Sequence, residues 1–198
     1  MQYQKLNNGV MMPMLGYGTF QIPPLQTEKC ILHALESGYR LIDSAAAYLN
    51  EKEIGKALQK SQIPRKELFI TTKVWVQDTG YEKTMKAFQT SLENLGLDYI
   101  DLYLIHQPYG DYYGSYRAME ELYMKGKIRA LGVCNFSPER FVDLYMNCSI
   151  KPMINQIEYH PFFQQKEVHH LFEQYQCITQ AWGPLNEGQR HIFENPIL

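Results

Sequence analysis

Short apolar segments with strand character alternate with helical segments along the whole chain, and this alternation restricts the fold more than any other feature. The apolar runs begin near residues 40, 69, 101, 128, 153 and 177. Successive starts are 24 to 32 residues apart, about the length of one strand–helix unit. The runs lack polar alternation, as expected of strands that are covered on both faces. The pattern therefore predicts an α/β fold with a parallel sheet and helices outside it.

One more short strand, expected near residues 15–17, brings the number of predicted strands to seven. A closed (β/α)₈ barrel has eight strands and typically about 250 residues, whereas this chain has 198 residues. We therefore predict a TIM-type (β/α) barrel, incomplete with about seven of eight strands, as a single domain over residues 1–198. Asn7-Asn8-Gly9 lies between extended pieces at 3–6 and 10–14 and predicts an N-terminal β-hairpin.

Helices are expected between the strands. The first has Thr27 as its N-cap and stops at Gly38. Ser137-Pro138 supplies an N-cap and a proline in the first helical position of another. The remaining helices are predicted at about 51–60, 80–95, 114–125 and 165–175.

Composition and charge exclude several classes of function. A net charge of −2 leaves no basic footprint for nucleic acid or for an acidic membrane surface. No apolar run approaches the roughly 18 residues that span a bilayer, and the N-terminus lacks a secretory signal. The four cysteines have no C-x-x-C spacing, so we expect reduced thiols in a cytoplasmic protein. No metal-binding motif is present.

Function in parallel α/β folds collects at the carboxyl ends of the strands. Each polar residue there has an ordinary structural explanation when taken alone: a cap, an ion pair, a packed ring or a solvated edge. Their occurrence over six consecutive units favours a site. The residues at these positions are Asp43, Tyr48, Lys73, His106, Asn135, Gln156, Glu158 and Trp182.

The residue types in this set suit proton delivery to a carbonyl oxygen. A phenol has a pKa of about 10, and a nearby ammonium lowers it, so Lys73 is expected to lower the pKa of Tyr48. Asp43 would hold Lys73 charged and in place. His106 would donate a hydrogen bond to the substrate oxygen. With no nucleophile and no metal cluster, the hydride would come from a cofactor.

The sequence also contains residues suited to bind such a cofactor. The amides of Asn135 and Gln156 suit a carboxamide group. Trp182 offers a flat face to an aromatic ring.

Long motifs in this chain resemble those of the aldo-keto reductases, a family of NADPH-dependent (β/α)₈ barrels. The resemblance covers essentially the whole chain. Its motifs are Met12-Pro13-x-Leu15-Gly16-x-Gly18-Thr19, Gly38-Tyr39-Arg40-x-Ile42-Asp43-x-Ala45-x-x-Tyr48-x-Asn50-Glu51, Leu97-Asp98-Tyr99-x-Asp101-Leu102-Tyr103-Leu104-Ile105-His106, Gly132-Val133-Cys134-Asn135-Phe136 and Asn155-Gln156-x-Glu158-Tyr159-His160-Pro161.

The resemblance implies reduction of aldehydes or ketones to alcohols, with Tyr48 as general acid. By it, the catalytic residues are Asp43, Tyr48, Lys73 and His106. The NADPH-binding residues are Gly18, Thr19, Asp43, Asn135, Gln156, Trp182, Gly183, Pro184 and Leu185. The substrate pocket is formed by Phe20, Tyr48, Trp75, His106 and Tyr109, and its occupant is a small carbonyl compound. Cys134 stands where many members have serine, which would weaken or alter one polar contact with the cofactor.

The chain departs from the family at its C-terminal side. The family's Lys-Ser segment and following Arg, which hold the cofactor's phosphate and adenine, have no counterpart among these residues. We expect NADPH affinity to be reduced on this account. A complete barrel would be monomeric, whereas open barrel edges near 15–17 and 177–181 would favour self-association or low stability.

Two other functions are compatible with the sequence. One is a non-catalytic barrel of the same family that binds a nucleotide or a partner. The other is an aldolase-type barrel in which Lys73 forms a Schiff base. The second chemistry needs a desolvated, neutral lysine, whereas Asp43 and Tyr48 favour a charged one.

Overall fold

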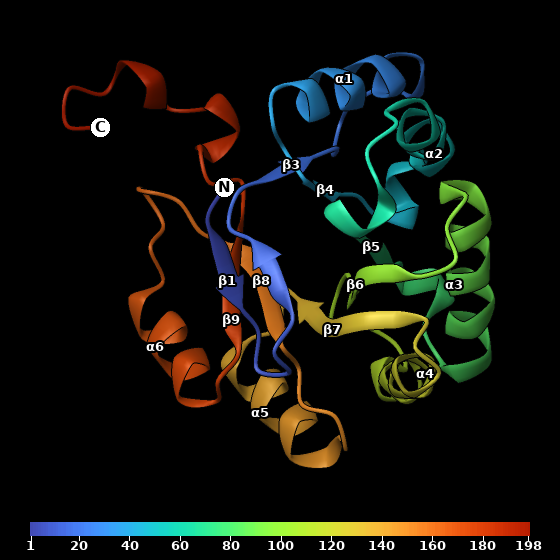
Figure 1. Cartoon of the computed structure of the whole chain (residues 1–198). Coiled ribbons are helices and arrows are strands. Elements are labelled where there is room, and N and C mark those ends of the chain that lie inside the picture. The colour runs from blue at the N-terminus through green and yellow to red at the C-terminus, as the bar shows by residue number, and fades with distance from the viewer.

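A curled parallel sheet forms the centre of the computed structural model, which describes residues 1–198 (Figure 1). Its strands pair in chain order, each with the next along the sequence. They are β3 (Gly16–Gly18), β4 (Leu41–Asp43), β5 (Phe69–Val74), β6 (Ile100–Ile105), β7 (Ile128–Cys134), β8 (Ile154–Glu158) and β9 (Ile178–Trp182). All six pairings are parallel, and β3 and β9 each have a neighbour on one side only. The expected incomplete barrel of seven strands is confirmed.

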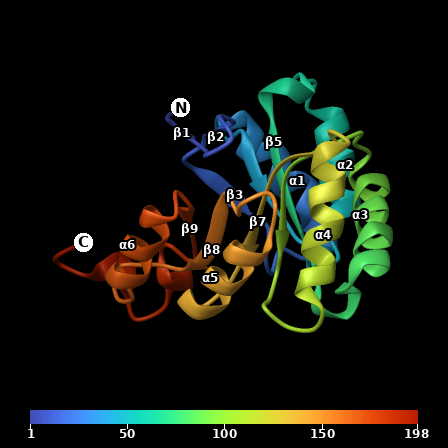
Figure 2. The same ribbon diagram turned by 90° about the horizontal axis from the view of Figure 1, so that it is seen from below.

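Six helices follow one another around the outside of the sheet (Figures 1 and 2). They are α1 (Pro24–Glu36), α2 (Glu51–Lys60), α3 (Tyr81–Leu95), α4 (Tyr112–Met124), α5 (Pro138–Asn147) and α6 (Lys166–Gln174). Each helix connects two neighbouring strands, as crossover connections in a parallel sheet require. None of them combines the length and the apolar character that crossing a membrane would demand.

The predicted start of the first helix is wrong. Helix α1 begins at Pro24, so Thr27 lies inside its first turn and is not the N-cap. Its hydroxyl donates back to the carbonyl oxygen of Pro23 at 3.0 Å. The proline explains the shift, because its fixed φ suits the first helical position and it has no N–H that would need a partner there.

The N-terminal hairpin covers the amino-terminal end of the sheet. Its strands are β1 (Tyr3–Lys5) and β2 (Met11–Pro13), paired antiparallel. In the turn, the Asn7 amide donates to the carbonyl of Gln176 at 3.3 Å, and the Asn8 amide donates to that of Arg129 at 2.9 Å. Both acceptors lie near the beginnings of strands, so the opposite end of the sheet is left for a site.

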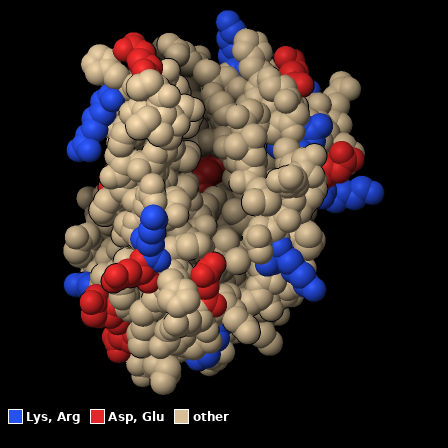
Figure 3. All heavy atoms as spheres, turned by 90° about the vertical axis from the view of Figure 1, so that its left-hand side faces the viewer, with Lys and Arg blue, Asp and Glu red and all other residues tan.

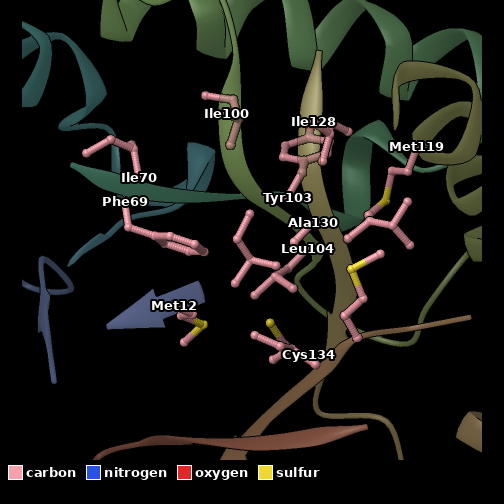
Figure 4. Packing of buried hydrophobic residues seen from close by; sticks show 14 of the residues in the cluster. Met12, Phe69, Ile70, Ile100, Tyr103, Leu104, Met119, Ile128, Ala130 and Cys134 are labelled. Carbon is pink, nitrogen blue, oxygen red and sulfur yellow. The ribbon is translucent and has the colours of Figure 1, made fainter. Parts of the chain in front are cut away.

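The interior of the curled sheet is filled by apolar side chains from the strands and the hairpin. Every residue of β5 and β6 is buried. Met12 of the hairpin faces the same interior as Phe69, Leu104 and Cys134 (Figure 4). The strands are therefore held from both faces, and the positions of their carboxyl ends are fixed by packing.

Candidate active site

Lys73 and the partly buried Asp43 form an ion pair at the carboxyl ends of β5 and β4. The Lys73 side chain is fully buried, and its ammonium donates to Oδ1 of Asp43 and to the carbonyl oxygen of Ser44, the latter at 2.9 Å. Burial works against the charge on this lysine, but the carboxylate of Asp43 outweighs burial, so the pKa of Lys73 is raised above its ordinary value. The structure thus holds Lys73 as an ammonium at neutral pH.

Tyr48 lies on a short 3₁₀ turn (Ala46–Tyr48) that begins three residues after the end of β4. Its hydroxyl is 3.5 Å from the Lys73 ammonium. The loop is anchored by the buried Asn50, whose amide donates to the carbonyl of Thr19 at 3.0 Å and whose Oδ1 accepts from the Ser44 hydroxyl at 3.1 Å. Tyr48 therefore stands where the sequence places it, beside the ammonium.

The expected lowering of the Tyr48 pKa is wrong in net direction. Burial raises the pKa of this phenol most strongly. The ammonium of Lys73 lowers it, and the carboxylate of Asp43 raises it again, leaving the pKa above the ordinary value. Lys73 thus limits an increase instead of producing a decrease, and the phenol keeps its proton at neutral pH.

The His106 ring follows β6 and lies edge-on to two aromatic rings. Its centroid is 5.6 Å from that of Tyr48 and 4.9 Å from that of Trp75. Burial and then the charge of Lys73 lower the pKa of His106 to about 3, so the ring is neutral at physiological pH. Nδ1 is buried without a hydrogen-bond partner.

Two of the expected pocket residues adjoin this group, and one stands apart. The Phe20 ring lies 5.0 Å from that of Tyr48, so Phe20 and Trp75 flank the phenol and the imidazole. Tyr109 is 59% exposed, and its ring lies 6.0 Å from the Arg140 guanidinium, away from the other two.

The side chains expected to bind a nicotinamide are held by hydrogen bonds, Trp182 and Asn135 to each other and Gln156 to the ion pair. The Trp182 indole N–H donates to Oδ1 of Asn135 at 2.8 Å, and the Asn135 amide donates to the carbonyl of His106 at 3.1 Å. The Gln156 amide donates to Oδ2 of Asp43 at 2.8 Å. This last contact is missing from the sequence prediction.

Cys134 is buried at the end of β7, with its sulfur 4.0 Å from Oε1 of Gln156. Burial raises the pKa of this thiol well above its usual range, although the charge of Lys73 acts in the opposite direction. The thiol is therefore protonated and a hydrogen-bond donor. No disulfide is formed by the four cysteines.

Other expected cofactor residues border the same end of the sheet. The Thr19 hydroxyl and the Thr19 backbone N–H both donate to the carbonyl of Asp43 at 3.0 Å, which ties β3 to the end of β4 next to Gly18. Gly183 follows β9 with a φ of 59°, and Leu185 is exposed. Thr19 is fully buried and already engaged, whereas the segment after β9 is open to solvent.

Two cavities of about 230 and 220 Å³ lie beyond β8 and β9 and share Glu158, His160 and Asn186. The second is also lined by Trp182, Gly183 and Glu187. Seen from the left side of Figure 1, the molecule has a furrow with acidic atoms at its bottom (Figure 3). No group of three or more His, Cys, Asp or Glu side chains is arranged to hold a metal ion.

The chain is similar to known proteins over nearly its whole length. Glyoxal reductase of Bacillus subtilis (strain 168) is 46% identical over 98% of this chain and 70% of its own length. A crystal structure of an aldo/keto reductase from Brucella melitensis superposes with a TM-score of 0.92 at 42% identity, covering 96% of this chain and 75% of that one.

A Bombyx mori aldo-keto reductase, solved in complex with NADP, superposes with a TM-score of 0.88 at 32% identity over 91% of this chain and 66% of that one. The sequence model of the Aldo/keto reductase family matches residues 6–194. Both the sequence and the incomplete barrel thus show that this chain belongs to the aldo/keto reductase family of oxidoreductases.

Proposed function

We propose that the chain reduces aldehydes or ketones to alcohols, with Tyr48 giving a proton to the carbonyl oxygen. The observation that carries this proposal is the phenol of Tyr48 lying 3.5 Å from the ammonium of Lys73, which is itself paired with Asp43. A protonated phenol beside a fixed positive charge is a general acid whose conjugate base is stabilised as it forms.

His106 would orient the substrate in this proposal. Its ring is neutral, because its pKa is lowered to about 3, and so it polarises a carbonyl oxygen by hydrogen bonding and not by a full charge. The Phe20 and Trp75 rings flank the two polar groups and would exclude water from the reacting oxygen. The relative from Bacillus subtilis is named for glyoxal, so a small dicarbonyl compound is the first substrate to test.

The residues at the carboxyl ends of β7, β8 and β9 fit a nicotinamide. The family relative from Bombyx mori was solved with NADP, and such a cofactor supplies a hydride when it is bound. The Gln156 and Asn135 amides each use one N–H inside the protein and have a second for a carboxamide. The Trp182 indole is held in one orientation by Asn135, so its face is positioned to stack.

The segment beyond β9 fits the phosphates less well. Glu158 and Glu187 both line the cavity next to Gly183 and Trp182, and two carboxylates repel an anionic group. We therefore propose that these 198 residues bind NADPH weakly and discriminate little between NADPH and NADH. Titration of both nucleotides, followed by quenching of tryptophan fluorescence, measures this. Micromolar binding with clear preference for NADPH would contradict weak binding.

The activity is tested by following NADPH consumption with glyoxal and with a simple aldehyde. Tyr48→Phe should lower turnover by about 100-fold or more, the usual contribution of a general acid. Tyr3→Phe, an exposed tyrosine on the hairpin, is the matched control and should leave turnover unchanged. Equal turnover of Tyr48→Phe and the unaltered chain would refute the assignment of the general acid.

The two alternatives predict different outcomes of these experiments. Nucleotide binding without turnover on any carbonyl compound would favour a non-catalytic binding barrel. Borohydride trapping of a ketone on Lys73 would favour the Schiff-base mechanism. The structure disfavours the latter chemistry, because the pKa of Lys73 is raised despite its burial, through Asp43, and a protonated amine is not a nucleophile.

A further inference from the structure

Gln156 makes a contact that its expected role toward a cofactor does not require. Its amide N–H donates to Oδ2 of Asp43 at 2.8 Å, although Gln156 is on β8 and Asp43 on β4, with three strands between them in the sheet. The contact spans the inside of the curled sheet. The other oxygen of the same carboxylate, Oδ1, pairs with Lys73. Each carboxylate oxygen thus has its own donor.

The orientation of the Gln156 amide is determined by its two neighbours. A carboxylate only accepts hydrogen bonds, so the NH₂ group must face Asp43. The amide oxygen then faces the other way, where the Cys134 sulfur lies 4.0 Å away. The thiol is protonated and can donate to that oxygen. Reversing the amide would place oxygen against carboxylate and N–H against a poor acceptor, so one orientation is strongly favoured.

These contacts form a continuous chain that ends at the phenol. Cys134 donates to Gln156, Gln156 donates to Asp43, Asp43 pairs with Lys73, and Lys73 is 3.5 Å from the Tyr48 hydroxyl. We propose that Gln156 is a positioning residue that holds Asp43 in the rotamer that keeps Lys73 beside Tyr48, and that Cys134 fixes the direction of its amide.

The inference rests on the proposed function for its relevance to catalysis but has its own observable, the proton affinity of Tyr48. The charges around the phenol are the carboxylate of Asp43 and the ammonium of Lys73, and the neutral His106 and Cys134 adjoin them. Without the Gln156 N–H, the Asp43 carboxylate is less well neutralised and acts more strongly on the phenol. The titration of Tyr48 should then move upward.

The second N–H of Gln156 is free to bind the cofactor while the first holds Asp43. An amide has two N–H groups, so Gln156 can hold Asp43 with one and a carboxamide with the other. One side chain would then connect the seat of the hydride donor with the group that delivers the proton. Loss of Gln156 would consequently change both cofactor affinity and the pH dependence of turnover, whereas a residue that only binds cofactor would change the first alone.

The test uses a fluorinated tyrosine placed only at position 48 by stop-codon suppression, titrated by ¹⁹F NMR in the full chain. The fluorinated phenol ionises at lower pH than tyrosine, which keeps the titration within the range where the protein is folded. Gln156→Met, similar in size but without an N–H, should raise the Tyr48 pKa by about half a unit. Cys134→Ser keeps a donor and should leave it unchanged, whereas Cys134→Val should raise it by a smaller amount.

Gln180→Met is the matched control, because Gln180 is the residue paired with Gln156 on the neighbouring strand β9 and forms no hydrogen bond with Asp43. It should leave the titration unchanged. If Gln156→Met does not fold, Gln156→Asn replaces it, since that amide is one methylene too short to reach Asp43. A folded Gln156 variant with an unaltered Tyr48 titration would overturn the inference. Absence of carbonyl reduction by the unaltered chain would instead refute the proposed function and leave the titration result standing.

Discussion

The Trp182 indole N–H donates to Oδ1 of Asn135 at 2.8 Å, which joins the end of β9 to the residue that follows β7. Asn135 has a φ of 61°, in the left-handed region that asparagine tolerates better than most residues. Its amide nitrogen reaches the carbonyl of His106 after β6. One side chain thus ties together three of the strand ends that form the site.

Replacing Asn135 should lower stability by two separable contributions. Asn135→Gly loses both hydrogen bonds but keeps the left-handed backbone, which should lower the free energy of unfolding by about 1–2 kcal/mol. Asn135→Ala loses the same bonds and adds a strained backbone, so it should lower it by a further 1–2 kcal/mol or so. Urea unfolding followed by tryptophan fluorescence measures both. Equal stability of the two variants would show that any strain at 135 is no larger than the extra entropy of the unfolded chain that glycine brings.

Substituting Lys73 alone should lower the stability of the chain much more than substituting Lys73 and Asp43 together. Lys73→Met leaves the partly buried Asp43 carboxylate without its cation and should destabilise the chain by roughly 3 kcal/mol, the lower end of the range for breaking a buried pair. Adding Asp43→Asn removes that charge and should restore most of the loss. Carbonyl reduction should be lost in both variants, because neither has the ammonium beside Tyr48. Thermal unfolding and NADPH consumption are the measurements, and a double variant no more stable than Lys73→Met alone would contradict this account of the pair.

His106 should make the chain less stable in mild acid. Its pKa is lowered to about 3 in the folded protein by burial and the Lys73 charge, whereas an unfolded histidine titrates near pH 6.5. The unfolded chain therefore binds the extra proton first as the pH falls. The contribution of the neutral His106 to the free energy of unfolding is fully present above about pH 6.5 and is lost progressively toward pH 3.

Between pH 6.5 and 5 this one histidine should lower the free energy of unfolding by roughly 1–2 kcal/mol. Urea unfolding at the two pH values, compared between the unaltered chain and His106→Gln, isolates it. The free energy of unfolding should fall less in the His106→Gln chain. An identical decrease in both chains would assign the pH dependence to other groups.

The free edges of β3 and β9 should promote association between copies of the chain, because unpaired edge strands accept new partners. Ile178 donates its N–H to the carbonyl of Met153, the residue just before β8, so by alternation the N–H of Ala181 points to the open edge. Ala181→Pro should therefore weaken association without breaking a bond to β8. Sedimentation velocity over a range of concentrations measures this, with Ala181→Gly as the control that keeps the N–H. A monomer at all concentrations would refute edge pairing.

The order of the elements and the set of strand-end residues follow from local patterns in the sequence. The apolar runs predict strands such as β5 and β6 because both faces of these strands are covered, and parallel strands necessarily bring Asp43, Lys73 and His106 to one end. The start of α1 was mispredicted because two competing signals, Pro24 and Thr27, lie three residues apart.

What the sequence does not predict depends on curvature and burial. The contact between Gln156 and Asp43 joins residues 113 positions apart on strands that are not neighbours, so only the curl of the sheet creates it. The pKa of Tyr48 depends on how completely its surroundings exclude water, and that degree of burial reverses the direction expected from Lys73 alone.

The pairing of the strands in chain order also determines when each part of the sheet can form during synthesis. Each strand from β4 to β9 pairs with the strand made just before it, so the sheet can lengthen at the rate at which the chain leaves the ribosome. The hairpin is the exception, because its Asn7 reaches Gln176, 169 residues later. The contact of Asn7 with residue 176 therefore cannot form until β8 and α6 have been made, although Asn8 of the same turn can already reach Arg129 at the start of β7.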